Sequence, residues 1–427
     1  MPRVVITGLG VIAPNGTGVP EFTSALREGK SGLSFQPKMS EMKLACQVAG
    51  TPKVESSAIE AKFRESTVRV MNRAMMFAGL AAIECWRDAG FNYDRDKTEG
   101  VDWDTGAIIG TGVAGMDTIA DRLVPMTNAG DVRRLGSAMP EQYMASAPSA
   151  FVGGLLGLGG QVTTMSSACA TGTESVIQAF EKIKSGHAQR ILSGSTEGDS
   201  VYSWAGFDAM RVCCRTHNDS PEKASRPMSA TAAGFVPAAG AGLLMLENLE
   251  SAQARGTRIY AEVLGGWVNS GGQRDGGTIT ASNPEGAQRC IRQALASANL
   301  TGRDIDYING HLTATMADPK EIANLMAAMD LKPDTFPLIN STKSMIGHVL
   351  GGSGAIECVA AVKQLHEGFV HPSINCEDLH AQLGEIKSSI PTAAKPAKLS
   401  TALKVSFGFG DVNACIVFRK WGENGTR

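Results

Sequence analysis

Several features that would point to particular classes of protein are missing from this 427-residue chain. Its 40 Lys and Arg residues nearly balance 42 Asp and Glu residues, so no overall field would attract nucleic acid or an anionic membrane. The nine cysteines form no CxxC pair and have no histidine at zinc-binding spacing, which argues against a metal site and a disulfide framework. Because no run of 18 apolar residues is present, we expect no membrane span and a soluble protein, cytoplasmic or from an organelle.

What is present predicts an α/β protein. Short β-rich runs, beginning with "RVVITGLGV" at the N-terminus, alternate with longer helical patterns, which is typical of sheets covered by helices. Apolar residues at helical spacing before Gly90 predict a helix with one buried face over residues 66–89. The chain is too long for one ordinary core and no low-complexity linker divides it. We therefore expect either two domains or one large layered domain made of two similar halves.

An internal repeat favours the two similar halves. The segment "CATGTESVIQAFEKIKSG" (169–186) aligns without gaps to "GGSGAIECVAAVKQLHEG" (351–368), at a constant offset of 182 residues. Gly172 matches Gly354, and apolar residues occupy matched positions after them. We predict two copies of one fold unit, over residues 1–250 and 251–427, each with a glycine-opened helix behind a strand.

Cys169 lies in a run of small residues, "TTMSSACATGTESV", at a predicted junction between a strand and a helix. The N-terminus of a helix has unpaired N–H groups and the positive end of the helix dipole, which together stabilise a thiolate and a developing oxyanion. A packing role fits this position equally well, because free cysteines are usually buried and eight others are present. Position alone leaves both interpretations open.

Two of the seven histidines lie where a strand meets a glycine-rich loop, His311 in "YINGHLTATMADPKE" and His348 in "STKSMIGHVLGGSG". Each alone is more typical of a hydrogen-bonded turn. Together with Cys169 they would bring a nucleophile and two polar groups to the ends of strands, as carbonyl chemistry on a thioester requires. We expect the other five to lie in polar, exposed stretches: His187, His217, His366, His371 and His380.

The motifs "SSACATG", "GHLTATMADPKE" and "STKSMIGHVLGGSGAIE", in this order, resemble the elongating β-ketoacyl-acyl-carrier-protein synthases of the thiolase superfamily, Cys-His-His subtype. The resemblance extends from the first strand to "SFGFGDVNA". It implies a thiolase-like five-layered αβαβα fold and an acyltransferase. The implied reaction condenses an acyl-enzyme thioester with malonyl-carrier, with loss of carbon dioxide, in a fatty acid pathway or a specialised polyene or polyketide pathway. No cofactor is implied, because the phosphopantetheine of acyl carrier protein carries the substrates.

The resemblance also assigns catalytic roles. Cys169 would accept the acyl chain, while His311 and His348 would flank the malonyl thioester and stabilise an enolate through uncharged imidazole N–H groups. Lys343 matches the family's active-site lysine, with Glu321 as its partner. The segment "DPKE" (318–321) is also typical of a helix capping box, so Glu321 has a structural interpretation beside the catalytic one.

Further positions match the family's gate and substrate-binding residues. Backbone N–H groups of Cys169 and Phe409 would form the oxyanion hole, and Phe409 in "SFGFG" would separate the acyl and malonyl pockets. Phe407 is interpreted as a substrate-binding residue or a core aromatic. Thr313 and Thr315 match the threonines that hydrogen-bond the phosphopantetheine arm.

The implied partner is acyl carrier protein, which is acidic and requires a basic entrance. The candidate basic residues precede or begin the helix predicted at 66–89, or lie in the "CCRTHND" loop: Lys62, Arg64, Arg69, Arg73 and Arg215. A homodimer, or a heterodimer with a related subunit, is a further implication of the resemblance.

Three departures from the family pattern indicate a specialised branch. Leu312 stands where glycine usually follows the first histidine, Ala232 and Ala233 replace an Arg-Asp pair, and Asp411-Val412 replaces a glycine and a threonine. These changes leave the acyl chain length and the shape of the malonyl channel open.

Other functions compete with the condensing enzyme. A non-catalytic chain-length partner of an active synthase typically lacks the cysteine that is present here as Cys169. A thiolase would need a second cysteine as base, whereas Cys415 lies six residues past Phe409 on a predicted strand. An initiating synthase would have Asn in place of His348.

Overall fold

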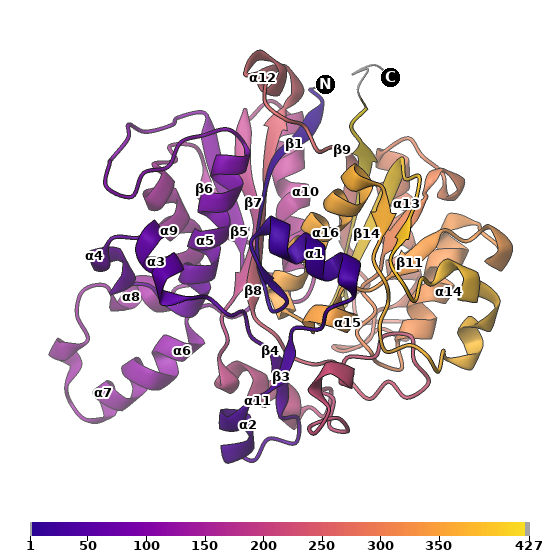
Figure 1. Cartoon of the computed structure of the whole chain (residues 1–427), viewed down its shortest axis with the longest axis horizontal. Helices are drawn as coiled ribbons and strands as arrows, with labels where there is room; N and C mark the ends of the chain where they lie inside the picture. Colours follow the sequence, from indigo (N-terminus) through magenta and orange to yellow (C-terminus); the bar gives the residue numbers. More distant parts are fainter. Residues whose placement is uncertain (1, 423–427) are drawn as a thin grey trace.

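In the computed structural model, which describes residues 2–422, a mixed sheet runs between layers of helices (Figure 1). The short β2 (Gly16–Thr17) pairs with β1 beside the main path of strands. In spatial order the path is β11 (Leu338–Asn340), β10 (Tyr307–Asn309), β14 (Thr401–Gly408), β15 (Val412–Lys420), β9 (Ala261–Ser270), β1 (Val4–Ala13), β8 (Gly240–Asn248), β7 (Arg190–Glu197), β5 (Thr105–Gly110) and β6 (Val162–Thr163).

One pattern of strand pairing occurs twice in this sheet. In the N-terminal half, β8 pairs antiparallel with β1 and β7, whereas β5 pairs parallel with β7 and β6. In the C-terminal half, β15 pairs antiparallel with β9 and β14, whereas β10 pairs parallel with β14 and β11. The halves meet where β1 and β9 pair antiparallel. The predicted boundary at 250/251 falls inside α12 (Leu249–Ala254), which connects β8 to β9, and it stays a prediction.

Helices divide the molecule into five layers. The central layer holds α10 (Thr171–Lys184) and α16 (Ser353–Glu367), which pack against each other and against strands of both halves. On one outer side α5 (Arg73–Asp88) and α9 (Ala147–Leu156) cover the N-terminal strands, and on the other α13 (Pro284–Ser297) covers β9 and β15 beside α14 (Asp318–Met329) (Figure 1). The predicted αβαβα order is therefore confirmed.

Strands between two helical layers are buried on both faces, and β1 shows this, since all ten of its residues are buried. Shorter elements surround the layers. They are α1 (Val19–Glu28), β3 (Leu33–Phe35), α2 (Pro37–Glu41), β4 (Val48–Gly50), α3 (Ser56–Lys62), α4 (Glu65–Val68), α6 (Met116–Thr118), α7 (Val124–Asn128), α8 (Met139–Tyr143), α11 (Val201–Ala209), α15 (Lys343–Ile346), β12 (Phe369–Val370) and β13 (Lys395–Pro396).

The two glycines matched by the internal repeat lie where α10 and α16 touch. A methyl group at Gly354 would lie 2.5 Å from the backbone nitrogen of Thr173, and one at Gly172 would overlap the backbone nitrogen of Ala355. Only glycine permits this approach, because the neighbouring atoms belong to backbone that cannot move aside. The repeat thus marks the contact that joins the two central helices.

The helix predicted over residues 66–89 is interrupted. The helix α4 ends at Val68, and α5 begins at Arg73 after Asn72, whose side chain accepts a hydrogen bond from the Met75 N–H group at 2.8 Å. Asn72 is a preferred N-cap residue, so it starts a new helix although the apolar spacing continues through it. The predicted end before Gly90 is confirmed.

Candidate active site

Cys169 lies in a tight turn between β6 and α10. The predicted strand "QVTTMSSA" is regular only at Val162–Thr163, and α10 begins two residues after the cysteine. Ala168 has a left-handed backbone with φ of 49°. The Thr171 hydroxyl holds the turn closed, since it donates to the Ala168 carbonyl at 2.7 Å and accepts from the Ser167 N–H group at 2.8 Å. The predicted strand-to-helix junction is therefore present, with a shorter strand.

The environment of Cys169 favours the thiol, although it lies near the N-terminus of a helix. Burial raises the pKa of Cys169 to about 11, and contacts with the Phe409 N–H group and the Lys343 charge lower it only in part. The side chain is 7% exposed. The stabilisation of a thiolate that the sequence predicts from the helix N-terminus is outweighed here, because the loss of hydration raises the pKa of Cys169 by more than the neighbouring groups lower it.

Alkylation of Cys169 will therefore depend strongly on pH. With a thiol pKa of about 11, the thiolate fraction rises about tenfold per pH unit between roughly pH 7 and 9. We expect the rate of iodoacetamide labelling, followed by peptide mass spectrometry, to rise with the same slope. A rate that levels off near pH 7 would contradict the buried-thiol interpretation, and Cys169→Ala serves as the control for labelling elsewhere.

His311 and His348 lie beside this sulfur. Their rings are 5.4 Å apart between centroids and nearly perpendicular. The Cys169 sulfur and one nitrogen of each ring all lie within 4.8 Å of one another. The structure therefore brings together the cysteine and the two histidines that the sequence singles out, from both halves of the chain.

Hydrogen bonds decide which ring nitrogen of each histidine has a proton. The Leu350 N–H group donates to His348 Nδ1 at 3.2 Å, so a neutral His348 has its proton on Nε2. The Lys343 ammonium lies 3.5 Å from His311 Nδ1 and can only donate, which gives His311 the same tautomer. Burial, and then the charge of Lys343, lower the pKa of both rings well below the usual range. The expected uncharged N–H donors fit this environment.

The partner predicted for Lys343 is wrong. Lys343 Nζ lies 2.6 Å from Glu357 Oε1 and donates to the His311 carbonyl at 2.7 Å. The Glu321 carboxylate instead accepts the backbone N–H groups of His311 at 2.6 Å and Leu312 at 2.9 Å. Burial raises the pKa of Glu321 to about 7. Glu321 thus holds the backbone of the histidine loop.

The alternative capping box at 318–321 is also wrong. Because Glu321 binds the histidine loop, its side chain does not bond to the start of α14, and that helix has no side-chain cap. Asp318 instead accepts N–H groups of Thr313 and Ala314, and of Met228 from another segment. The motif therefore shapes the loop before the helix.

Two buried charged residues of the site were missed by the sequence reasoning. Glu357 lies on α16 within the quoted motif "GAIE", and Lys404 lies on β14; both side chains are 0% exposed. Lys404 Nζ lies 2.9 Å from Glu357 Oε2. The sequence contains a signal for both residues, because a charged residue inside an otherwise apolar helix face or strand, as in "TALKVSF", indicates a buried charge that needs a partner.

The residues predicted to bind substrate lie at the end of β14 and in the loop after β10. The Phe409 ring lies 6.0 Å from the Phe207 ring, and the Phe407 ring stands perpendicular to His311 at 6.3 Å between centroids. The hydroxyl oxygens of Thr313 and Thr315 are 3.2 Å apart. The roles of these residues stay predictions.

The predicted carrier-binding residues do not form one free basic patch. Arg69 pairs with Glu65 at 2.5 Å, Arg73 binds Asp199 through two nitrogens, and Arg215 donates to the Asp208 carbonyl. Lys62 is partly buried at the end of α3. These ion pairs lower the positive charge that the sequence suggests.

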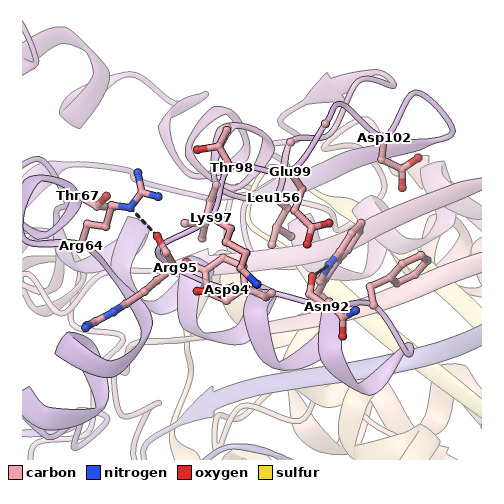
Figure 2. Close-up of a pocket in the computed structure, with 17 residues that line it drawn as sticks. Arg64, Thr67, Asn92, Asp94, Arg95, Lys97, Thr98, Glu99, Asp102 and Leu156 are labelled. Atoms are coloured by element: carbon pink, nitrogen blue, oxygen red, sulfur yellow. Dashed lines mark hydrogen bonds and ion pairs between the residues drawn. The ribbon is translucent and has the colours of Figure 1, made fainter.

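Arg64 borders a cavity of about 330 Å³ beside α4 (Figure 2). Its guanidinium donates to the Arg95 carbonyl, and Lys97 faces the same space together with acidic Asp94 and Glu99. The charges lining this cavity are mixed rather than uniformly basic.

Two of the three places where the sequence departs from the family pattern, Leu312 and Asp411-Val412, lie in structured parts of the site. Leu312 is buried, and Asp411 has a left-handed backbone with φ of 62°. The Asp411 carboxylate accepts the N–H groups of Gln273 and Asn283, both at 2.9 Å, which ties the turn after Phe409 to the loop before α13. Ala232 and Ala233, in contrast, lie in a partly exposed segment.

One of the five histidines predicted to be exposed is buried. His371 is 0% exposed, with Nδ1 donating to the Pro372 carbonyl at 2.8 Å and Nε2 3.0 Å from the Thr342 hydroxyl. It follows the buried strand β12, which packs against α16 and keeps the next residue inside. The prediction of an exposed His371 is therefore wrong. The other four are exposed or partly buried.

The donor set of Cys169 and the two histidines is also of a type that binds zinc. The expectation of no metal and no cofactor is not tested by these distances and stays a prediction. Among the helices within residues 2–422, none is both long and apolar enough to cross a membrane. The cytoplasmic location stays a prediction.

A five-layered α/β fold with a buried Cys-His-His group defines a condensing enzyme of the thiolase type. The chain belongs to the β-ketoacyl synthase family. The family's N-terminal domain matches residues 1–252 of this chain, and the family's C-terminal domain matches residues 260–377. The predicted family and the predicted class of enzyme, a ketosynthase acyltransferase, are confirmed.

Relatives cover nearly the whole chain. The 3-oxoacyl-(acyl-carrier-protein) synthase 1 of Haemophilus influenzae is 36% identical over 422 residues, which is 99% of this chain and 100% of the relative. The synthase 2 of Rhizobium meliloti is 34% identical and covers 99% of both chains. A β-ketoacyl synthase from Burkholderia phymatum has a TM-score of 0.88 at 27% identity, covering 99% of this chain and 100% of that one.

A further solved relative is the ketosynthase complex AntDE:AntF, a type II polyketide ketosynthase with its acyl carrier protein and a bound hexaketide. The TM-score is 0.85 at 28% identity, with 98% of this chain and 100% of that chain covered. The predicted thiolase-like fold is therefore confirmed.

Proposed function

We propose that this chain condenses an acyl group held on Cys169 with malonyl-acyl-carrier protein to form 3-oxoacyl-acyl-carrier protein. The observation that carries the proposal is the group formed by the Cys169 sulfur and the His311 and His348 nitrogens, all within 4.8 Å. A nucleophile and two uncharged N–H donors at this distance are the parts that acyl transfer and enolate formation require.

In the first half-reaction, the Cys169 sulfur attacks the carbonyl carbon of the acyl thioester. The new C–S bond forms as the bond to the carrier breaks, and the proton of the thiol leaves with the carrier sulfur. The backbone N–H groups of Cys169 and Phe409, both of which contact the sulfur region, would stabilise the oxyanion. Because the resting pKa is about 11, proton removal accompanies the attack.

In the second half-reaction, the malonyl thioester oxygen accepts the Nε2–H groups of His311 and His348. The C–C bond to the malonyl carboxylate breaks and carbon dioxide leaves. The electron pair of that bond stays on the thioester and forms an enolate, which attacks the acyl carbon on Cys169. The new C–C bond forms as the C–S bond breaks, and the cysteine sulfur recovers a proton from solvent. Each donor of this kind lowers the barrier by about 2.7–4 kcal/mol.

The carrier would contact Lys62, Arg64 and Arg69 at α3 and α4, and Arg215 in the loop after α11. The hydroxyl groups of Thr313 and Thr315 would bind the phosphopantetheine arm near His311. The AntDE:AntF structure, in which a ketosynthase is in complex with its acyl carrier protein, supports this class of partner.

We also propose a homodimer, or a heterodimer with a related subunit. The strand β6 lies at one end of the sheet, and no strand within residues 2–422 pairs with its outer edge. Trp103, 76% exposed, lies close to Gly159 just before this strand. A free edge with an exposed aromatic beside it is suited to contact with a second subunit.

The first test compares wild type with Cys169→Ala. Incubation with a panel of acyl-carriers will add an acyl mass to the wild-type protein alone, and added malonyl-carrier will then yield carbon dioxide and a product two carbons longer. Intact-protein mass spectrometry and carbon dioxide release measure both steps.

Cys214→Ala is the control, because it removes another buried thiol outside the site. Folded wild type that takes no acyl group from any carrier would overturn the proposal and favour the non-catalytic chain-length partner. The chain length that reacts fastest would also define the acyl preference.

A further inference from the structure

Lys404 is a buried charge that the reaction described above does not use. It lies on β14, and its side chain is 0% exposed. Its ammonium donates to the Val405 carbonyl and lies 2.9 Å from Glu357 Oε2. An ammonium is rarely fully buried unless it is paired with an opposite charge. The burial of the Lys404 ammonium therefore requires the Glu357 carboxylate.

Glu357 is shared between two lysines. Its other oxygen, Oε1, lies 2.6 Å from Lys343 Nζ, which in turn donates to the His311 carbonyl. Lys343 and Glu357 alone would form a neutral pair. With Lys404 the three groups have one negative and two positive charges, all buried beside the histidines.

Other ionisable groups face this cluster from the elements around it. Glu321 and Asp318 lie on α14, and Glu321 acts on the charge of Lys343. The charge of Lys404 lowers the pKa of Cys358 on α16, and the charge of Glu357 raises the pKa of Tyr307 on β10. Cys415 on β15 also lies within the influence of the Lys404 charge, and His371 within that of Glu357. The site residues Cys169, His311 and His348 face the cluster as well.

The charge of Lys404 affects the pKa values of the two histidines rather than the pKa of Cys169. Burial and the charge of Lys343 lower the pKa of both His311 and His348 most, and Lys404 lowers both further, after the effect of His348 in the case of His311. The charge that lowers the Cys169 pKa is that of Lys343. The malonyl side of the reaction is therefore the side on which Lys404 acts.

We propose that Lys404 is a positioning residue for decarboxylation: it shares Glu357 with Lys343 and so leaves a net positive charge that keeps His311 and His348 as uncharged N–H donors. The same charge favours the negative charge that develops on the malonyl thioester. This inference rests on the proposed function, since it concerns the decarboxylation half-reaction.

The test uses Lys404→Met, which keeps an unbranched side chain of similar length and leaves the Lys343–Glu357 pair intact. The matched control is Lys398→Met, which removes an exposed lysine and the same charge. Histidine-labelled protein without substrate is titrated by ¹⁵N NMR from about pH 8 down to the lowest pH at which both proteins stay folded, because the pKa values of both rings lie well below the usual range. Malonyl-carrier decarboxylation and Cys169 acylation are then measured over the same range.

We expect His311 and His348 to take up protons at higher pH in Lys404→Met than in wild type, so the acid limb of decarboxylation shifts to higher pH. Decarboxylation slows about tenfold, below the 10²–10³-fold expected for loss of a direct donor, while acylation is retained. Lys398→Met matches wild type. Should Lys404→Met fail to fold, Lys404→Gln, which removes the charge but keeps a polar N–H donor in the side chain, is titrated instead.

Histidine titrations that coincide in the folded variant and wild type would overturn the role of Lys404. Failure of the proposed function would look different, because wild type would then release no carbon dioxide while its histidines could still be titrated. The two failures are therefore distinguishable.

Discussion

His348→Ala will slow malonyl-carrier decarboxylation by about 10²–10³-fold while acylation of Cys169 is affected far less. The imidazole removed is an uncharged ring whose Nδ1 accepts from the Leu350 N–H group and lies 2.8 Å from the Ser353 hydroxyl. These two contacts orient Nε2–H towards the reacting group, so the variant loses a preorganised donor. Carbon dioxide release and acyl mass gain, measured on the same preparation, separate the two half-reactions.

A comparison with His348→Asn sharpens this test, because an amide retains an N–H donor and should retain more activity than alanine. His217→Ala, a partly buried histidine elsewhere, is expected to behave as wild type. Equal losses of acylation and decarboxylation in His348→Ala would show that His348 does not act selectively on the malonyl group.

Glu357→Gln will lower the free energy of unfolding by about 3–5 kcal/mol, because it leaves the Lys343 and Lys404 ammonium groups buried without a carboxylate. The ions lie 2.6 Å and 2.9 Å from Glu357, and all three side chains are at most 1% exposed. Urea unfolding followed by circular dichroism measures the loss. Glu385→Gln, which removes an exposed carboxylate, should change stability little.

Combining Glu357→Gln with Lys343→Met and Lys404→Met should restore most of that stability, since no unpaired charge then remains. The triple variant is expected to be folded but inactive. If Glu357→Gln were as stable as wild type, the cluster would not depend on this carboxylate.

The parts of the site that the sequence predicts well are those with local signatures. Cys169, His311 and His348 each stand in a glycine-rich junction, and the alternation of strands and helices predicts the layers. Lys343 and Lys404 are 61 residues apart in the chain, and no local pattern places both on Glu357. Pairing between distant elements, rather than propensity, determines this part of the site.

The errors have the same origin. Neither the resting protonation of Cys169 nor the true contacts of Glu321 could be inferred, because burial and the course of the histidine loop depend on the assembled halves. Asn72 shows the opposite case, in which a single residue with a strong capping preference divides a helix that the apolar spacing predicts as continuous. Such residues can be read from the sequence when they are weighed against periodicity.

The contact between Gly172 and Gly354 has a consequence for the evolution of new substrates. Cys169 lies two residues before α10 and His348 five residues before α16, so the backbone contact between these helices sets the spacing between nucleophile and histidines. Natural or laboratory selection for new substrates therefore has to leave Gly172 and Gly354 in place, because a side chain at either position would push the nucleophile and the histidines apart.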